Sequence, residues 1–349
     1  MATNETRMQL AEAQAAELAG AQAAAAEELL DAARPRSNVR GVGVGVKWSN
    51  GQPTGEPALV VLVNQKLPKS AVAKADLIPA KLGGAQTDVL SIGEVFAGGG
   101  QAHEAGAQLL ARRQRPAEGG YSVGHFAITA GTIATAVYDI LPGGTVTPPV
   151  NGSGVPPRFY ILSNNHVLAN SNAAAIGDPI LQPGPFDGGA DPTDRIARLS
   201  RFVPITFAPA VPLALHNNLV DAAVAEGQFH DLDREVYWQG YVRAWRPKAI
   251  VLPGTLVKKT GRTTNHTVGR ITVISATVDV GYGGGRVARF RDQIITTNMS
   301  QGGDSGSLLM TLDNVAVGLL YAGSSVATIH NQIENVRALL RIEVAEQIG

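Results

Sequence analysis

The sequence between residues 255 and 323 contains a series of short apolar runs: TLVKKTGR (255–262), VGRITVISATV (268–278), QIITTN (293–298), SGSLLM (305–310) and VAVGLLYAG (315–323). These runs are rich in Val, Ile, Thr and Leu, and Gly or Asn residues separate them. Runs of this length and composition are typical of strands. Many short strands joined by turns favour antiparallel sheets that form a sandwich or barrels over an alternating α/β sheet.

The same pattern extends toward the N-terminus. It appears in GHFAITAGTIATAVYD (124–139), FYILSNNHVL (159–168), DRIARLSRFVPI (194–205), LVDAAVAEG (219–227) and EVYWQGYV (235–242). We therefore expect a mainly β protein, with one barrel in residues 121–235 and a second in residues 236–349. Near the end, the apolar residues of 331–341 recur at helical spacing, which predicts a closing helix.

The first third of the chain has a different composition and pattern. Residues 8–33, within an N-terminal segment 1–37, are dominated by Ala, Glu, Gln and Leu, which predicts a long helix. Its apolar face is mostly alanine, so a packed arm, a self-association element and a frayed tail remain open. Short strand-like runs then predict a small strand-rich module in 38–97, and a Gly-, Ala- and Arg-rich tract predicts a linker in 98–120.

Two loops need an interpretation of their own. GVGVG (41–45) lies inside a Val/Gly alternation and leads into the turn SNGQ (49–52), so a strand is favoured over a phosphate-binding loop. FDGGADPTD (186–194) is acidic, but it lacks the ligand spacing of a known calcium loop. A solvated turn is the simpler interpretation, and an ion site is the alternative.

Composition excludes several classes of partner. The 349 residues carry zero formal net charge and are 44% hydrophobic, so no overall field would attract the chain to nucleic acid or an anionic membrane. The absence of cysteine removes disulfides and thiolate chemistry and fits a cytoplasmic location. The N-terminus has acidic residues where a secretory signal needs positive charge, and no apolar run approaches the length of a membrane span.

Three segments carry side chains suited to nucleophilic catalysis: ILSNNHVL around His166, NLVDAAVAEG around Asp221 and QGGDSGSLLM around Ser305. In this interpretation Ser305 attacks, His166 takes and returns the proton, and Asp221 orients the imidazole. Asp221 stands alone in an apolar stretch, where a buried carboxylate needs a partner such as the His166 ring. The order His, Asp, Ser on a β background is one in which such a triad occurs.

The glycines around Ser305 support this interpretation. They allow a tight turn that exposes the hydroxyl and points the N–H groups of Gly303 and Ser305 at a developing oxyanion. The simpler explanations are a plain Gly-Ser turn, a core histidine with satisfied hydrogen bonds and an acid that faces water. The three segments together, in this order, favour catalysis. None of the other histidines forms a closely spaced pair, so zinc chemistry has little support.

The sequence resembles a known family in LSNNHVL, VDAAVA, VKKTGRTTNHTVGRI and GGDSGSLL. These motifs are similar to those of trypsin-like serine proteases with the chymotrypsin fold, and among them to the plant narrow-leaf-type proteases and their bacterial relatives. The resemblance covers residues from about 119 to the end. It implies two antiparallel β-barrels of chymotrypsin type, a serine endopeptidase that needs no cofactor, and a protein or peptide substrate. It gives GRTT and the neighbouring lysines no catalytic role, and we expect those lysines to face solvent.

The resemblance also implies a specificity pocket and a partner for Asp304. It places Met299 at the pocket floor, with Ser300 beside it and Gly323 in a pocket wall, which predicts a preference for neutral apolar residues before the scissile bond. In many secreted relatives the acid before the nucleophile pairs with a new amino terminus. Here GGYSVGHF (119–126) offers no such start, so Asp304 must find another partner.

Two other classes of function remain as alternatives. One is a protease-like protein that binds a peptide without turnover. The other is a scaffold with a vestigial triad that assembles into a homo-oligomer through the N-terminal helix or module.

Overall fold

The strands at the C-terminal end of the chain close into a barrel in the computed structural model, which describes residues 4–31, 33–98, 109–140 and 158–345. Each strand is hydrogen-bonded to the next in the order β17 (Leu256–Gly261), β20 (Leu308–Thr311), β21 (Val315–Gly323), β22 (Ala327–Gln332), β19 (Val287–Thr297) and β18 (Asn265–Gly281). Strand β17 also pairs with β18, which completes the ring. Most connections between successive strands are short, but the one between β19 and β20 is longer and carries Ser305.

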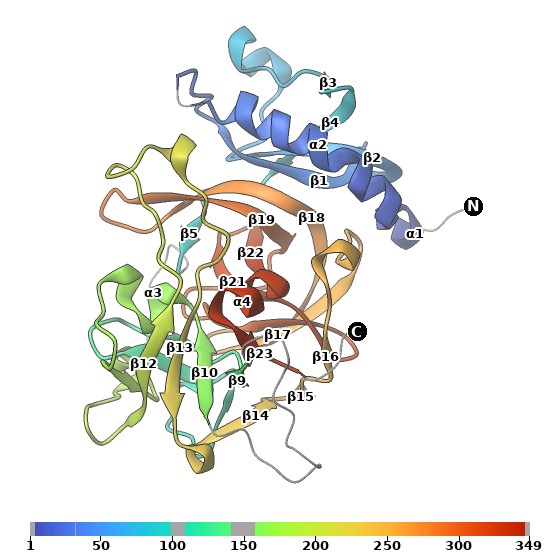
Figure 1. Cartoon of the computed structure of the whole chain (residues 1–349). Helices are drawn as coiled ribbons and strands as arrows, with labels where there is room; N and C mark the ends of the chain where they lie inside the picture. The colour runs from blue at the N-terminus through green and yellow to red at the C-terminus, as the bar shows by residue number, and fades with distance from the viewer. Residues whose placement is uncertain (1–3, 32, 99–108, 141–157, 346–349) are drawn as a thin grey trace.

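A second ring is built from the middle of the chain. Its strands follow the order β9 (Ala136–Asp139), β10 (Phe159–Ser163), β13 (Ala223–Gly227), β12 (Arg195–Phe202), β11 (Pro179–Leu181), β7 (Ser122–His125) and β8 (Gly131–Thr132). Strands β8 and β9 follow each other closely in the chain, and between them the Ala134 N–H donates to the Leu162 carbonyl of β10 at 2.9 Å. The predicted class, a mainly β protein with two antiparallel barrels of chymotrypsin type, is confirmed (Figure 1).

The C-terminal segment ties the two barrels together. Helix α4 (Ile333–Leu340) follows β22, and the predicted closing helix is thereby confirmed. After it, β23 (Ile342–Glu343) returns to the first barrel and pairs with β9. Ile333, Val336 and Leu340 are buried in a core cluster that includes residues of both barrels, so the helix fills the junction between them.

The N-terminal strands extend the second barrel. Strand β1 (Val39–Ser49) pairs with β18, and the sheet continues through β2 (Gln52–Val63), β4 (Ala85–Ser91) and the short β3 (Lys81–Leu82). The expected module of residues 38–97 is thus hydrogen-bonded to the barrel. The Gly residues of GVGVG allow this close contact, since a side chain at Gly41 would begin 2.3 Å from the Thr277 carbonyl oxygen. The strand interpretation of this stretch is confirmed.

The alanine-rich segment forms a packed arm. It contains α1 (Asn4–Met8) and α2 (Glu12–Leu29), which lies across β1 and β2 (Figure 1). Leu29 is 1% exposed and belongs to the same core cluster as Val257 of the barrel. The Gln22 side chain donates to the Val42 carbonyl at 3.1 Å. Small alanine side chains let the helix approach the sheet closely, so it covers one face of the second barrel's core.

Shorter elements complete the described chain. They are α3 (Asn165–Leu168), β5 (Phe96–Ala97), β6 (Ala117–Gly119), β14 (Leu232–Val236), β15 (Gly240–Tyr241), β16 (Ala244–Trp245) and the 3₁₀ turns η1 (Lys69–Ala71), η2 (Lys74–Asp76), η3 (Leu109–Ala111), η5 (Asn170–Asn172), η6 (Pro185–Asp187), η7 (Leu213–Leu215), η8 (Phe229–Asp231) and η9 (Lys248–Ile250). Strand β6 pairs with β14, so the end of the expected linker is part of a sheet. Residues 99–108 of that linker lie outside the described residues.

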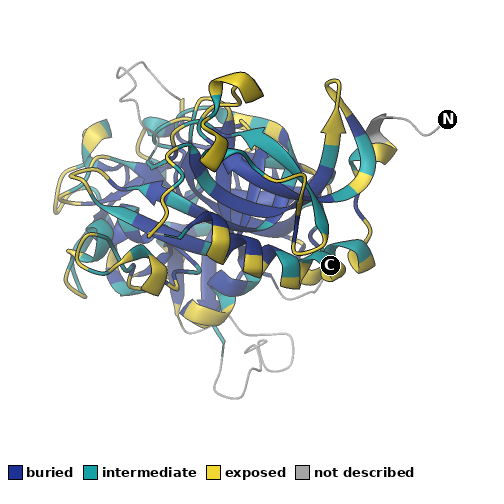
Figure 2. Cartoon of the chain, turned by 90° about the horizontal axis from the view of Figure 1, so that it is seen from above, coloured by how far each residue is buried: buried dark blue, intermediate teal, exposed yellow. Residues whose placement is uncertain are grey.

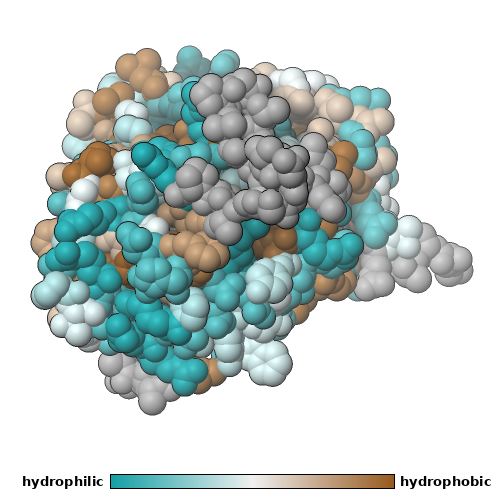
Figure 3. Space-filling model, turned by 60° about the horizontal axis from the view of Figure 1, so that its bottom comes forward, coloured by the Kyte–Doolittle hydropathy of each residue, from teal (hydrophilic) through white to brown (hydrophobic). Residues whose placement is uncertain are grey.

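Burial of the residues follows the arrangement of the strands in the two barrels (Figure 2). Buried residues fill the strands, and exposed ones concentrate in turns and on the outer face of α2. On the face shown in Figure 3, hydrophobic side chains occur in separate groups among hydrophilic ones. None of the described helices is long and apolar enough to cross a membrane.

One buried histidine predicts a loss of stability in acid. His330 of β22 is fully buried, with Nε2 3.0 Å from Thr296 Oγ1, and burial lowers its pKa from 6.5 to about 3. Between these values the unfolded chain binds a proton that the folded chain does not, so unfolding is favoured as the pH falls. We expect this group to remove about 2 kcal/mol of the unfolding free energy between pH 7 and pH 5.

Urea unfolding of wild type and His330→Gln at pH 7 and at pH 5 measures how much of the loss in unfolding free energy on acidification is due to His330. The variant should lose less stability on acidification than wild type. The exposed His230→Gln serves as the control and should behave as wild type does. Equal acid sensitivity of His330→Gln and wild type would contradict the prediction.

Candidate active site

His166 lies on a single helical turn that follows a buried strand. Strand β10 ends at Ser163, and α3 begins with Asn165. Val167 and Leu168 on this turn are buried in the core of the first barrel, which fixes its orientation. The imidazole remains 13% exposed on the other side. The apolar residues after His166 therefore anchor the turn and leave the ring at the barrel edge.

Asp221 is the partner of this imidazole. It precedes β13, is fully buried, and its Oδ2 lies 2.7 Å from His166 Nδ1. Its Oδ1 accepts the His166 N–H at 3.1 Å. A carboxylate only accepts hydrogen bonds, so this contact puts the proton of the neutral imidazole on Nδ1 and leaves Nε2 as the basic atom. The expected pairing of the lone buried acid with His166 is present.

Tyr282 is a further partner of Asp221 that the sequence interpretation missed. Its hydroxyl donates to Asp221 Oδ2 at 2.7 Å, and it lies just after the end of β18. Burial, and next the charge of Asp221, raise the pKa of Tyr282 well above its ordinary value, so the hydroxyl keeps its proton. Nothing in the surrounding sequence, VGYGGG, distinguishes this tyrosine from a turn residue.

Ser305 lies in a turn that only glycine allows on both sides. Gly303 and Gly306 have φ angles of +97° and +99°. A side chain at Gly306 would begin 2.1 Å from the Thr132 carbonyl oxygen, so this turn is fixed against the first barrel. Within the described part of the chain, the N–H groups of Gly303 and Ser305 make no hydrogen bond. Both remain available as donors, as an oxyanion site requires.

The Ser305 hydroxyl and the His166 imidazole make no hydrogen bond with each other among the described contacts. Ser305 Oγ donates to the Tyr321 carbonyl at 3.4 Å, and His166 Nε2 has no partner among the described residues. Gly98 lies near both of these groups. Its N–H also donates to the Tyr321 carbonyl at 3.4 Å, and a side chain on it would begin 3.9 Å from His166 Nε2. Catalytic hydrogen bonds are often long or absent before substrate binds.

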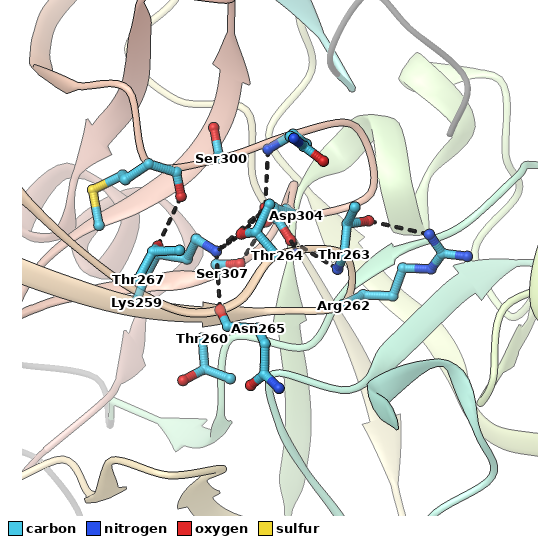
Figure 4. Close-up of polar contacts among 12 residues, drawn as sticks. Lys259, Thr260, Arg262, Thr263, Thr264, Asn265, Thr267, Ser300, Asp304 and Ser307 are labelled. Carbon is cyan, nitrogen blue, oxygen red and sulfur yellow. Dashed lines mark hydrogen bonds and ion pairs between the residues drawn. The ribbon is translucent and has the colours of Figure 1, made fainter. Parts of the chain in front are cut away.

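Asp304 is held by a lysine from the same chain (Figure 4). Its Oδ2 lies 3.2 Å from Lys259 Nζ, and both side chains are completely buried. Its carboxylate also accepts the backbone N–H groups of Thr263, Thr264 and Gln301 and the Thr264 hydroxyl at distances from 2.6 to 3.0 Å. Thus an internal ammonium and four other donors compensate the acid before Ser305.

This cluster corrects the expectation that the lysines of VKKTGR face solvent. Lys259 is 0% exposed, and burial lowers its pKa, while the charge of Asp304 opposes that shift. The strand alternation explains the difference between neighbours, since successive side chains of β17 point to opposite faces and Lys258 lies on the outer one. The sequence signal was the pair of adjacent lysines on one strand, of which only one can face out.

The acidic loop also differs from its expected form as a solvated turn. The side chain of Asp187 is 5% exposed and forms a buried ion pair with Arg262 of the GRTT stretch, and it accepts the Ser122 hydroxyl. Asp191 pairs with Arg195, and Asp194 with Arg113. Among the residues that the structure describes, no group of acidic and histidine side chains could hold a metal ion. The carboxylates of this loop serve as partners for arginines.

The residues assigned to a specificity pocket separate into two groups. Ser300 and Gly323 face each other, since a side chain at Gly323 would begin 3.3 Å from Ser300 Oγ, which contacts Thr328 Oγ1 at 2.8 Å. Met299 is 4% exposed and lies in the core cluster beneath α2. Asp292, the nearest acid before these residues in the sequence, lies 2.7 Å from Lys248 Nζ, which compensates its charge.

A matched pair of tyrosines tests the role of the Tyr282 hydroxyl. Tyr282→Phe removes a donor to a buried carboxylate, which should lower the unfolding free energy by about 1.5–3 kcal/mol. Tyr321→Phe removes a buried hydroxyl without a partner among the described residues and should be neutral or stabilising. Urea unfolding measures both, and equal effects of the two substitutions would contradict this role.

Comparison with known proteins gives neighbours only at the level of structure. Neither a family model nor a curated protein matches the sequence. The chain is similar to a glutamic-acid-specific serine protease, with 19% identity over 65% of this chain and 98% of that one and a TM-score of 0.43. It is also similar to protease A of Thermobifida fusca, with 15% identity over 65% and 97% of the chains and a TM-score of 0.42.

A third neighbour is the chymotrypsin of Cellulomonas bogoriensis, with 19% identity over 65% of this chain and 96% of that one and a TM-score of 0.40. These neighbours are serine proteases of chymotrypsin fold. At such identities and TM-scores, the likeness does not define the activity or the substrate of this chain.

Proposed function

We propose that this protein is a serine endopeptidase that hydrolyses peptide bonds through an acyl-enzyme. The observation that carries the proposal is the His166–Asp221 pair beside a glycine-flanked serine. The acid is fully buried, its Oδ2 lies 2.7 Å from Nδ1, and the basic Nε2 remains free of partners among the described residues. This is the arrangement by which a base activates a weak serine nucleophile.

Each step of the reaction has a residue assigned to it. His166 Nε2 takes the Ser305 proton while Oγ attacks the carbonyl carbon, and the N–H groups of Gly303 and Ser305 stabilise the oxyanion. His166 then protonates the leaving amine, and the same cycle with water releases the acid product. Asp221 and Tyr282 hold the imidazole in one tautomer. The nucleophile–base contact requires the Ser305 hydroxyl to leave the Tyr321 carbonyl.

A second function is favoured by one observation. Ser305 Oγ donates to the Tyr321 carbonyl at 3.4 Å and makes no hydrogen bond with His166 among the described contacts. A peptide-binding or self-assembling scaffold with a vestigial triad would tolerate this state. A fluorophosphonate probe, which reacts with an activated serine, distinguishes the two functions, since only the peptidase should be labelled.

We further propose a preference for neutral apolar residues before the scissile bond. Ser300 and Gly323, which face each other, carry no charge, and Met299, which the resemblance placed at the pocket floor, lies instead in the core cluster beneath α2. A lysine or arginine head buried there would lack a partner, which costs several kcal/mol after relaxation. Hydrolysis of a positional peptide library should therefore favour aliphatic residues. A clear preference for Arg or Lys would contradict the neutral pocket.

The relationship to the plant narrow-leaf-type proteases belongs to this proposal and rests on the sequence motifs. The cytoplasmic location, the homo-oligomer and the absence of a nucleic-acid or membrane partner remain predictions.

A further inference from the structure

Strand β5 lies on the edge of β21 beside the candidate active site. Phe96 pairs with Gly323 and Ala97 with Ala322 in antiparallel register, and Phe96 also pairs with Gly281 of β18. The Gly98 N–H continues the ladder with its bond to the Tyr321 carbonyl at 3.4 Å. Three consecutive residues from the N-terminal part of the chain thus form an added strand on the second barrel, next to α3 (Figure 1).

This added strand ends at the catalytic groups. The Tyr321 carbonyl that accepts the Gly98 N–H also accepts the Ser305 hydroxyl. A side chain on Gly98 would begin 3.9 Å from His166 Nε2. The backbone of Gly98 therefore lies near both the proposed base and the proposed nucleophile, as the residue before a scissile bond would have to.

We propose that Phe96–Gly98 occupies the strand on which a peptide substrate binds, as a competitor tethered within the same chain. The inference rests on the proposed peptidase function. Extended peptides bind to sheet edges by adding a strand, with main-chain hydrogen bonds supplying affinity. Here the edge at Tyr321–Gly323 already has such a partner, so a substrate must displace it first.

The backbone at Gly98 indicates a competitor and not a substrate. Its φ angle is +81°, in the region that L-residues with side chains rarely adopt. An extended peptide that continued along β21 would keep a negative φ at this position. This backbone conformation therefore differs from that of an extended substrate at the same position, which favours a competitor over a substrate.

Side-chain packing holds the segment in place. The Phe96 ring covers Gly281, where a side chain would begin 2.7 Å from the ring. Just before it, the Gly281 N–H donates to the Val95 carbonyl at 3.0 Å, and Ile92 and Val95 are buried in the second barrel's core. These anchors keep the competitor at a high effective concentration, which a weak three-residue strand needs in order to compete.

Two substitutions should release the edge without touching the catalytic groups. Phe96→Ala removes the ring, and Gly98→Pro removes the N–H and requires a φ near −65°. If the segment is bound about nine-tenths of the time, its release should lower KM about tenfold and leave kcat unchanged. Fluorophosphonate labelling should accelerate by the same factor.

Matched controls exclude general effects of the substitutions. Phe229→Ala removes a 59% exposed ring on η8, and Gly177→Pro alters another glycine with positive φ whose N–H is bonded, to the Leu199 carbonyl at 2.8 Å. Both should keep wild-type KM and labelling rate. If Phe96→Ala and Gly98→Pro have the same KM as the two controls, the inference is overturned. Fluorophosphonate labelling of wild type would in that case still support the peptidase function.

A measurement on Ser305→Ala full-length protein separates occupancy from catalysis. The Gly98 amide should be protected from hydrogen exchange, and Phe96→Ala in that background should remove the protection. Exchange at the rate of a free peptide would overturn the inference. If the amide is protected but wild type is never labelled, the peptidase proposal fails, and the competitor role fails with it.

Intact mass of purified wild type provides the remaining test. The uncut chain is expected. A chain broken after Gly98, and intact in Ser305→Ala, would show that the segment is consumed as a substrate and would overturn its role as a competitor.

Discussion

Replacement of Ser305 with alanine is expected to abolish both fluorophosphonate labelling and peptide cleavage while the fold stays intact. His166→Ala should have the same effect, because triad members act as a unit and their losses do not add. Asp221→Asn should reduce turnover by a factor on the order of 10⁴, since the imidazole then adopts the wrong tautomer. Labelling followed by mass spectrometry, together with turnover of a peptide library, measures these losses.

An exposed serine provides the control for this experiment. Ser70→Ala on η1 should retain wild-type labelling and turnover. Circular dichroism should show the same strand content in all variants, so that loss of activity is not loss of fold. Wild-type turnover by Ser305→Ala would disprove the assignment of the nucleophile.

The second large effect is expected at Lys259. Lys259→Met leaves the Asp304 carboxylate buried without a cation, and breaking a buried pair in this way costs about 3–5 kcal/mol of unfolding free energy. Because Asp304 lies between the two proposed oxyanion donors, kcat should fall as well, and a lost donor alone reduces kcat about 10²- to 10³-fold. Lys258→Met, one residue earlier on the outer face, should change neither quantity appreciably.

A double substitution separates charge from packing. Lys259→Met with Asp304→Asn has no buried charge at this position, so it should regain part of the lost stability. Urea unfolding and kcat on one peptide substrate measure both effects. If Lys259→Met is as stable and as active as Lys258→Met, the ammonium does not hold this loop.

The ion pair of Lys259 with Asp304 also affects how the loop around Ser305 is ordered. In many secreted proteases of the family that the sequence resembles, a new amino terminus pairs with the acid before the nucleophile. Here the partner comes from β17 and is in place in the intact chain, where the Asp304 carboxylate also orders the backbone N–H groups of Thr263, Thr264 and Gln301. The loop around Ser305 is thus ordered in the uncleaved chain. The element that we propose limits access of a substrate is the Phe96–Gly98 segment on β21.

The sequence by itself determined the elements and the chemistry that depends on local pattern. Short apolar runs rich in Val, Ile and Thr, separated by Gly or Asn, predicted the strands, because β-branched residues favour strands and Gly and Asn favour turns. The spacing of Ile333, Val336 and Leu340 predicted α4. The isolated acid in LVDAAVA required a buried partner, and His166 is that partner.

Only the tertiary structure decided which distant groups meet. Tyr282 reaches Asp221 across 61 positions, and Lys259 reaches Asp304 across 45. Both contacts depend on barrel closure and strand register, which local propensity does not specify. The same holds for β5, whose two residues carry no distinctive pattern. Hydrogen bonding to an available sheet edge and packing of the Phe96 ring on Gly281 place that strand beside the candidate active site.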